Sequence, residues 1–314
     1  MKNFFAAMIL LTAIFICGCG DEKISHFERT EKVMGTLVTL KADGKNPQAA
    51  VDESFEKIFE LVDNVKTDVK NLNDNAGNGQ FIKISADVFE MLKISQEYSQ
   101  LTDGAFDVTC GAAVDLWRTA RKNKILPAPE EISAAKNFVG FNHLHLNESE
   151  QSAMIDTAGV KINLGGVGKG YGADVARKIF IKHGITDGII DFGTSSIFVF
   201  GKKKIGLKNP RGEHEISSVI ELENSALSTS GDYEQFFIVN DRRYHHIIDP
   251  KTCLPTDNGV ASASVIVSGD VENCGTVADI LSTSVVVLGK EQGKNLLEKL
   301  PVPKNSVRLS VTTL

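Results

Sequence analysis

Apolar and polar residues recur along the chain with two different periods, and each period predicts its own kind of element. From Asn46 to Val65 the apolar residues recur every three or four positions, as on one face of an amphipathic helix. A second helix begins after the capping residue Ser85, and a third runs from Tyr171 to His183, where Gly184 ends it. The stretch from Val33 to Ala42 alternates in places, is rich in Thr and Val, and predicts a strand.

Short apolar runs bounded by turn residues predict further strands in the second half of the chain. These runs are Gly188 to Asp191, Ile197 to Phe200, Phe236 to Val239 and Ala261 to Val267. Strands and helices are interleaved without a regular β-α-β alternation, and the chain has no internal repeat or low-complexity tract. We therefore predict the α+β class, with mixed or antiparallel sheets and packed helices, and we place no internal domain boundary.

The first eighteen residues have the pattern of an export signal. Lys2 precedes an apolar run from Phe4 to Ile16, which at thirteen residues is too short to cross a bilayer core of roughly 30 Å as a helix. The run ends in Ile16-Cys17-Gly18-Cys19, which resembles the bacterial lipobox, with Cys19 as the lipidated first residue after cleavage. An ordinary export signal with incidental cysteines is the alternative.

This leader sets the expected organisation and location of the chain. We predict a lipoprotein signal peptide over residues 1–18, a tether over 19–29 and one folded region over 30–314, without an internal division. The mature protein is then expected outside the cytoplasm, as a cell membrane lipoprotein that faces the periplasm.

Composition and charge narrow the possible functions. The 314 residues are 42% hydrophobic and 24% charged, which is ordinary for a packed globular protein and excludes a disordered chain. The formal net charge is −6, and −7 once the signal with its single Lys2 is removed, so no basic field is present to hold a nucleic acid. After Cys19 only Cys110, Cys253 and Cys274 remain, without C-x-x-C spacing, so neither a disulfide framework nor a thiolate metal site is indicated.

A glycine-rich segment precedes the third predicted helix. It reads Asn163-Leu164-Gly165-Gly166-Val167-Gly168-Lys169-Gly170-Tyr171, which would leave backbone amides free at a helix N-terminus and add the positive charge of Lys169. These features favour a phosphate-binding loop over a turn that merely needs glycine. The segment is not a P-loop, because no Ser or Thr follows Lys169, and it lacks the Rossmann fingerprint.

The densest group of polar residues lies between Leu227 and Leu288. Asp279 and Thr283 are four residues apart and would share one face of a helix, offering a carboxylate and a hydroxyl to a hard cation such as Mg²⁺. Such a cation would bridge the phosphates held by the glycine-rich loop. His246 is either a hydrogen-bonded strand histidine or, with Asp249 as an orienting partner, a general base.

Other patterns carry less information. Met34-Gly35-Thr36 allows a close approach of the backbone to a ligand, and Gly104 to Thr109 forms a loop near Trp117, which is equally well explained as a core residue. His143 and His145 would share a strand face, but no third metal ligand stands nearby in the sequence. No Gly-x-Ser-x-Gly elbow is present, so a serine hydrolase has no candidate nucleophile.

Taken in order, six segments resemble the motifs of the FAD:protein FMN transferases, the ApbE-like flavin transferases. The segments are Met34 to Thr36, Ala105 to Thr109 with Val114 to Trp117, Leu164 to Tyr171, Ser230 to Tyr233, His246 to Pro250 and Ala278 to Thr283. The resemblance implies an ApbE-like fold and a Mg²⁺-dependent reaction in which FAD is split at its pyrophosphate. AMP leaves, and the FMN half is joined through a phosphoester to a Thr or Ser of a target protein.

The resemblance also assigns roles to residues. It implies Asp279, Thr283 and the backbone carbonyl of Gly166 as metal ligands, His246 as the base and Asp249 as its support. The implied FAD contacts are Met34, Ala105, Phe106, Asp107, Asn163, Lys169, Ser230, Gly231, Asp232 and Tyr233. The expected partners are FAD, a flavin-accepting protein domain such as a subunit of a membrane redox complex, and the membrane itself through the lipid anchor.

The chain departs from the family pattern at several positions. No Tyr or Phe occurs between Asn64 and Asn75, where the family often has an aromatic residue for flavin stacking. Cys253 stands in place of a usual Gly, Asn163 in place of an acidic residue, and Gly193-Thr194 in place of Gly-Gly. Three alternatives to the transferase remain open from the sequence. They are an FAD pyrophosphatase that releases FMN and AMP, a non-catalytic flavin-binding or solute-binding lipoprotein, and a structural envelope lipoprotein.

Overall fold

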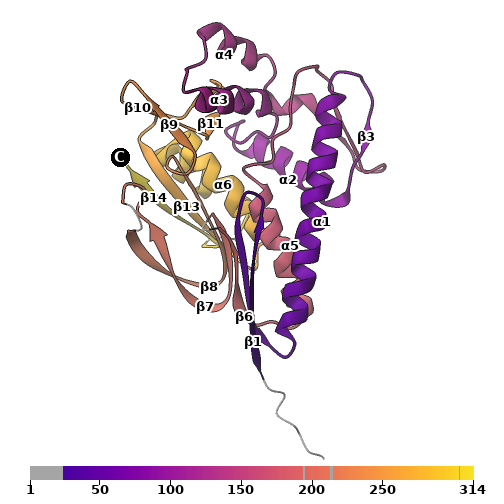
Figure 1. The fold of residues 1–314 in the computed structure, drawn as a ribbon, viewed down its shortest axis with the longest axis vertical. Helices are drawn as coiled ribbons and strands as arrows, with labels where there is room; N and C mark the ends of the chain where they lie inside the picture. Colours follow the sequence, from indigo (N-terminus) through magenta and orange to yellow (C-terminus); the bar gives the residue numbers. More distant parts are fainter. Residues whose placement is uncertain (1–23, 194, 213–214, 304) are drawn as a thin grey trace, which may run out of the picture.

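Seven antiparallel strands form the central sheet of the computed structural model, which describes residues 24–193, 195–212, 215–303 and 305–314 (Figure 1). Their spatial order is β1 (Ser25–Val33), β2 (Thr36–Gly44), β6 (Asp187–Phe192), β7 (Ser196–Lys208), β8 (Ile216–Gly231), β13 (Val260–Ser268) and β14 (Val307–Thr313). Every neighbouring pair in this order is antiparallel. The predicted α+β class with antiparallel pairing is confirmed.

The first hairpin replaces the single strand that the sequence predicts from Val33 to Ala42. β1 ends at Val33 and β2 begins at Thr36, and these two residues face each other across the turn. Met34 and Gly35 form the turn with positive φ angles of 52° and 74°, as a two-residue hairpin loop requires. A positive φ is uncommon for a residue with a side chain, so the surrounding structure must hold Met34 in this turn conformation.

Three helices cover one face of the sheet. They are α1 (Pro47–Asp74), α5 (Gly168–Lys182) and α6 (Cys274–Leu288). α1 packs on α5, α5 packs on α6, and α6 lies against β8 and β13. Because α6 is covered both by the sheet and by α5, it is buried on almost all sides, from Cys274 to Val286.

Two helix boundaries differ from the predicted ones. α1 continues past Val65 to Asp74, since Val69 and the buried Leu72 extend its apolar stripe toward the core. α5 begins at Gly168 instead of Tyr171, so part of the glycine-rich segment forms the first turn of the helix. The helix capped by Ser85 is confirmed, and Ser85 Oγ accepts from the backbone nitrogen of Val88.

The remaining elements lie outside the central sheet and the three helices that cover it, and among them α3 and α4 lie near β9, β10 and β11 (Figure 1). The helices are α2 (Ala86–Leu101), α3 (Gly111–Asn123), α4 (Pro129–Lys136), α7 (Lys290–Glu298) and the 3-10 helix η1 (Phe141–His143). The strands are β3 (Ile82–Lys83), β4 (Leu144–Asn147) and β5 (Ser152–Ile155) in one small sheet, and the hairpins β9 (Phe236–Val239) with β10 (Arg242–His245) and β11 (Ile248–Asp249) with β12 (Leu254–Pro255).

A second, smaller core joins α3 to these hairpins. Trp117 stacks on Tyr244 with 5.6 Å between ring centroids, and its Nε1 donates to the carbonyl of Cys253 at 2.8 Å. Phe237 and Ile248 complete the cluster. Trp117 is therefore a core residue, and its packing fixes α3 opposite the hairpins.

Several sequence predictions concern residues 1–23, which lie outside the described part of the chain. The signal peptide, Cys19 as a lipidation site and residues 19–23 of the tether are among them, and they stay predictions. Residues 25–29 of the predicted tether instead form the first part of β1. Within the described ranges, no helix combines the length and hydropathy needed to cross a bilayer. Cys110, Cys253 and Cys274 are free thiols in the structure.

Candidate active site

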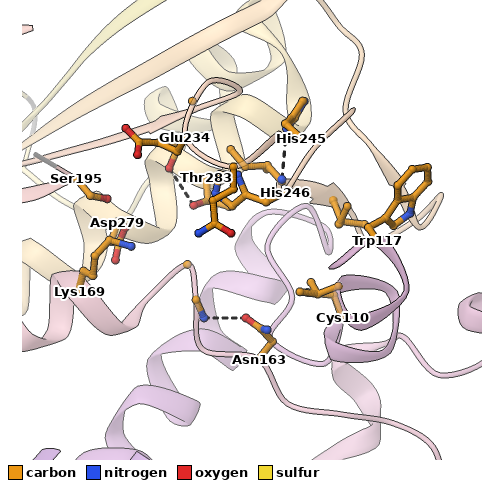
Figure 2. A pocket seen from close by; sticks show the side chains of 18 of the residues that line it. Cys110, Trp117, Asn163, Lys169, Ser195, Glu234, His245, His246, Asp279 and Thr283 are labelled. Atoms are coloured by element: carbon orange, nitrogen blue, oxygen red, sulfur yellow. Dashed lines mark hydrogen bonds between the residues drawn. The ribbon is translucent and has the colours of Figure 1, made fainter. Parts of the chain in front are cut away.

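A cleft of about 410 Å³ opens between the glycine-rich loop, α6, α3 and the β9–β10 hairpin (Figure 2). Its volume lies in the usual range of ligand sites. The predicted site residues that line it are Met34, Ala105, Phe106, Asp107, Asn163, Gly166, Lys169, Ser230, Gly231, His246, Asp279 and Thr283. The fold thus brings together residues that are distant in sequence, whereas Asp232, Tyr233 and Asp249 are not among the lining residues.

The glycine-rich loop runs along the floor of the cleft. Asn163 Oδ1 accepts from the backbone nitrogen of Gly165 at 2.9 Å, which fixes the first turn of the loop. A Cβ on Gly166 would lie 3.1 Å from the Phe106 ring and 3.4 Å from Thr283 Oγ1. The loop backbone is therefore held between Phe106 and the hydroxyl of Thr283, a position that only glycine fills without displacing either neighbour.

The same loop brings α5 into close contact with α6. A Cβ on Gly170 would lie 2.3 Å from the carbonyl oxygen of Gly275 and 2.7 Å from Cβ of Asp279, so glycine is required at this crossing. The backbone nitrogen of Gly170 donates to Asp279 Oδ2 at 2.9 Å. Lys169, half-buried in the first turn of α5, adds its charge at the helix N-terminus, where anions are favoured.

Asp279 and Thr283 lie one turn apart on α6 and both line the cleft, as their spacing predicts. Asp279 is 2% exposed, and Ser228 on β8 donates to its Oδ1 at 3.1 Å. Thr283 Oγ1 lies 3.1 Å from Oγ of Ser230, two residues further along the same strand. The strand and the helix together hold a carboxylate and a hydroxyl side by side.

His246 follows β10 and opens onto the cleft opposite this pair (Figure 2). The cleft walls desolvate part of the ring, and this partial desolvation lowers the pKa of His246 to about 4, with further lowering by the nearby His245, Lys169 and Arg121. The imidazole is therefore neutral at neutral pH and able to accept a proton. A hydrogen bond with the backbone of Gln235 opposes the shift.

The neighbouring His245 has a different role. Its side chain is buried, with Nε2 2.9 Å from the carbonyl of Thr256 and Nδ1 accepting from the backbone nitrogen of Ile247 at 3.3 Å. Both ring nitrogens are therefore occupied by contacts that hold the chain after β10. Of the two adjacent histidines, His246 is the one whose ring is available to a ligand.

Asp249 does not orient His246 as the sequence suggests. Its Oδ1 accepts from the backbone nitrogen of Lys251 at 3.0 Å, and its Oδ2 accepts from the hydroxyl of Thr252 at 2.8 Å. No hydrogen bond joins it to His246 in the described structure. The Asp-Pro sequence makes a tight turn after β11, and the carboxylate is used to close that turn.

Asp232 and Tyr233 support the site from outside instead of lining it. Asp232 is buried and forms a bidentate ion pair with Arg211, at 2.8 and 2.6 Å. The ring of Tyr233 covers Gly231 so closely that a Cβ there would lie 2.3 Å from it, and Lys208 stands 5.1 Å from the ring centroid. Both residues therefore shape the end of β8.

Asp107 lines the cleft, but its carboxylate is directed at its own loop. Oδ1 accepts from both the backbone nitrogen and the hydroxyl of Thr109, each at 2.7 Å. Burial raises the pKa of Asp107 above its ordinary value, and these hydrogen bonds oppose the rise. Thr109 Oγ1 in turn accepts from the backbone nitrogen of Gly140 at 2.9 Å, so Asp107 anchors the loop beside η1.

Sequence reasoning included Val114 to Trp117 in a motif segment but assigned no site residue to the α3 side of the cleft. Val114, Trp117, Arg118 and Arg121 line it, and their spacing of three, four and seven residues is that of one helix face. The same spacing could have identified Arg121 from the sequence once Trp117 was placed. Arg121 also donates to the Gln235 side chain at 2.7 Å and so joins α3 to the turn before β9.

The charge and donor set of the cleft can accommodate a divalent cation together with phosphate groups. Among the described residues, no three His, Cys, Asp or Glu side chains form a group that could hold a metal ion by themselves. One carboxylate, one hydroxyl and backbone oxygens next to a phosphate site are instead the partial ligand set that Mg²⁺ completes with water and substrate oxygens.

Comparisons with known proteins agree with this geometry. The model of the ApbE family matches residues 34–304. A protein of Treponema pallidum named FAD:protein FMN transferase is 27% identical, over 93% of this chain and 86% of that protein. The apbe protein of Thermotoga maritima superposes with a TM-score of 0.80 at 28% identity, covering 92% of this chain and 94% of that one. Flavin transferase ApbE of Vibrio cholerae, at 24% identity and a TM-score of 0.76, covers 93% and 94% and has the same fold.

Proposed function

The chain belongs to the ApbE family, and from this premise we propose that it is an FAD:protein FMN transferase. In the proposed reaction the hydroxyl oxygen of an acceptor Thr or Ser attacks the phosphorus of the FMN half of FAD. The new O–P bond joins FMN to the acceptor, and the pyrophosphate bond breaks so that AMP leaves. The observation that carries the proposal is the gathering of His246, Asp279 and Thr283 around one cleft with the glycine-rich loop.

The glycine-rich loop and Lys169 are proposed to hold the pyrophosphate. The loop ends at the N-terminus of α5, where the helix dipole favours an anion, although the backbone nitrogens of Gly165, Gly168 and Gly170 already donate within the protein. Lys169 supplies a local positive charge in a protein whose formal net charge is −6. Phosphoryl transfer depends mainly on positioning and charge neutralisation, and this side of the cleft can supply both.

Mg²⁺ is the proposed metal, with Asp279, Thr283 and the carbonyl of Gly166 as its protein ligands. The loop at Gly166 passes close to Thr283, because a Cβ on the glycine would lie 3.4 Å from Thr283 Oγ1, and this closeness and the single carboxylate in the set support the assignment. When bound, such a cation neutralises charge on the phosphate oxygens.

His246 is proposed as the base that accepts the proton of the acceptor hydroxyl. Its lowered pKa keeps the ring neutral at the pH of the periplasm, so a nitrogen lone pair is available. The ring is exposed toward the cleft, where an acceptor segment can approach it. The same exposure lets water take the place of the acceptor, which would give FMN and AMP as products, and FAD hydrolysis is therefore the second candidate activity.

The location and the partner follow from the leader and the reaction. We propose that Cys19 carries a lipid anchor and that the enzyme faces the periplasm, so its acceptors are exported proteins or exposed domains of membrane proteins, such as subunits of a membrane redox complex. A structural or non-catalytic flavin-binding lipoprotein would have no need for Asp279, Thr283 and His246 in one cleft.

A flavinylation assay tests the proposed function. The mature protein is incubated with FAD, Mg²⁺ and a purified flavin-accepting domain, and the products are separated on a denaturing gel. We expect a fluorescent acceptor band with wild-type protein, no band with Asp279→Ala, and an unchanged band with Asp63→Ala, because Asp63 is exposed on α1.

Product analysis separates the two candidate activities. AMP with a fluorescent acceptor supports transfer, whereas FMN and AMP without a labelled acceptor support hydrolysis. The acceptor is first shown to be labelled by a transferase of known activity. If the same acceptor then stays unlabelled and FAD stays intact, both candidate activities are rejected.

A further inference from the structure

We propose that Ser228 and Ser230 on β8 are positioning residues for the cation site, and that a chain of hydroxyl groups between β8 and α6 directs the oxygen atoms of Asp279 and Thr283 into the cleft. The inference rests on the proposed function for the identity of the cation. It adds two residues that hold the ligands without being ligands themselves.

The register of strand and helix creates this arrangement. Ser228 and Ser230 are two residues apart on β8 and therefore point to the same face of the sheet. α6 packs against that strand, and Asp279 and Thr283 are four residues apart on it. Each serine thus lies next to one proposed ligand, at 3.1 Å in both cases.

Ser228 has one proton and more than one neighbour that could accept it. The Asp279 carboxylate, the carbonyl of Ser195 and the hydroxyl of Ser196 are all 3.1 Å from its Oγ. The Ser195 carbonyl already accepts from the backbone nitrogen of Thr229 at 2.7 Å, whereas Ser228 is the hydrogen-bond donor to Asp279 Oδ1. A bond to an ionised acceptor is also the stronger one, so the Ser228 proton goes to Asp279.

Both oxygens of Asp279 are then fixed by donors from opposite sides. Ser228 holds Oδ1 from the sheet, and the backbone nitrogen of Gly170 holds Oδ2 from α5 at 2.9 Å. A carboxylate oxygen has two lone pairs, so each oxygen keeps acceptor capacity that can face the cleft. The carboxylate cannot turn away from the cleft without breaking one of these bonds in a buried environment.

The hydroxyl of Thr283 must also be oriented if it is to bind a cation. A hydroxyl that binds a cation does so through an oxygen lone pair, and its proton must point elsewhere. Ser230 Oγ, at 3.1 Å, is the hydrogen-bond partner of Thr283 Oγ1 in the described structure. When Ser230 accepts the Thr283 proton, a lone pair of Thr283 is left to face the cleft.

Ser282 is the last hydroxyl group in this series of hydrogen bonds. Ser230 then donates its own proton to Ser282 Oγ at 2.8 Å. Ser282 donates onward to the carbonyl of Asp279 at 3.0 Å, and its Oγ also lies 3.4 Å from Ser228 Oγ. Every proton in the chain has an acceptor, and the chain ends at the residue that carries the negative charge.

Manganese binding tests the proposal with a readout other than activity. Mn²⁺ is titrated into the mature protein saturated with FAD, and free Mn²⁺ is measured by electron paramagnetic resonance. Partners that orient a metal ligand typically contribute about 10- to 100-fold to metal affinity, and we expect losses in this range for Ser228→Ala and Ser230→Ala. Ser230→Thr retains the hydroxyl and is expected to restore the affinity.

Two measurements separate positioning from general damage to the fold. FAD affinity in EDTA should be unchanged in Ser228→Ala, because Ser228 holds a cation ligand and does not line the cleft, whereas Ser230 lines it and is itself an implied FAD contact. Ser284→Ala is the matched control. Ser284 on α6 is fully buried, as Ser228 is on β8, but it donates to the carbonyl of Ile280 in its own helix. If Ser228→Ala does not fold, Ser230→Ala is compared with Ser230→Thr at saturating FAD, and equal Mn²⁺ affinity of these two variants would overturn the positioning role.

The outcomes distinguish this proposal from the proposed function. Unchanged Mn²⁺ affinity in both serine variants, or a wild-type protein that binds no Mn²⁺, would overturn the positioning role. Weakened Mn²⁺ binding in the variants of a protein that labels no acceptor would support the positioning role while rejecting the transferase.

Discussion

Asp174 on α5 caps the start of α6 by accepting from both the backbone nitrogen and the hydroxyl of Thr276, each at 2.7 Å. Its other oxygen accepts from the backbone nitrogen of Gly275 at 2.9 Å. Asn273, the residue before the helix, has a φ of 50° and makes no side-chain cap bond. The cap of α6 therefore comes from a neighbouring helix, and it fixes the helix that carries Asp279.

We predict that Asp174→Asn destabilises the protein by about 2 to 3 kcal/mol, because a buried carboxyl oxygen that accepts hydrogen bonds is lost and the amide NH₂ group faces donors. Urea unfolding followed by circular dichroism measures the change. Asp63→Asn, on the exposed face of α1, should alter the free energy of unfolding by less than about 0.5 kcal/mol. Equal stability of the two variants would remove the capping role of Asp174.

Two glycines at the start of α5 give a matched pair for the helix crossing. Gly170→Ala places a Cβ against Gly275 and Asp279, and we expect a loss of roughly 1 to 3 kcal/mol from overpacking, with weaker cation binding. Gly168→Ala meets no atom within 4 Å and should be neutral or stabilising, since alanine favours the helix. Thermal unfolding of both variants checks this, and a Gly170→Ala protein as stable as Gly168→Ala would contradict the tight crossing.

The lowered pKa of His246 predicts how activity depends on pH below neutrality. Since the folded-state pKa is about 4, the ring remains neutral as pH falls from 7.5 to 5.5, and kcat/KM should show no loss from this group in that range. His246→Gln should reduce the rate by roughly 10² to 10⁴. An NMR titration of the histidine ring protons, with the His246 signal assigned from the variant, tests the pKa directly, and a midpoint near 6.5 would refute it.

Asp156 provides a test of stability against pH away from the cleft. Hydrogen bonds from His145, Thr157 and His143 outweigh the effect of burial and lower the pKa of Asp156 to about 2. Because the folded pKa lies below the unfolded value near 3.8, the stabilisation is present above pH 4 and is lost as pH falls from about 4 to about 2. The free energies of unfolding of wild type and Asp156→Asn should therefore converge as pH falls through that interval. A difference between them that stays constant with pH would show that the contacts do not depend on the charge of Asp156.

The sequence predicted those parts of the site that depend on local spacing. Asp279 and Thr283 lie on one helix face because four residues make about one turn, and the glycine-rich segment leads into a helix as predicted. Its amides are mostly not free as predicted, since the backbone nitrogens of Gly165 and Gly170 donate to side chains. The pairing of His246 with Asp249 failed because closeness in sequence does not decide where a side chain in a tight turn points.

Contacts between distant elements were not predictable from spacing. Ser228 acquires its position beside Asp279 only when β8 lies under α6, and Asp174 becomes the cap of α6 only when α5 crosses it. The turn at Met34 was read as the start of a strand, because Val33 and Thr36 both favour β structure and only the register shows that the chain reverses between them.

Strand β1 also has a consequence for how far the cleft stands from a membrane. It has nine residues from Ser25 to Val33, and at about 3.4 Å per residue it spans roughly 30 Å. Its last residue leads into Met34 at the cleft, while its first is close in sequence to the proposed anchor at Cys19. The proposed anchor therefore joins the protein at the end of β1 opposite to the cleft.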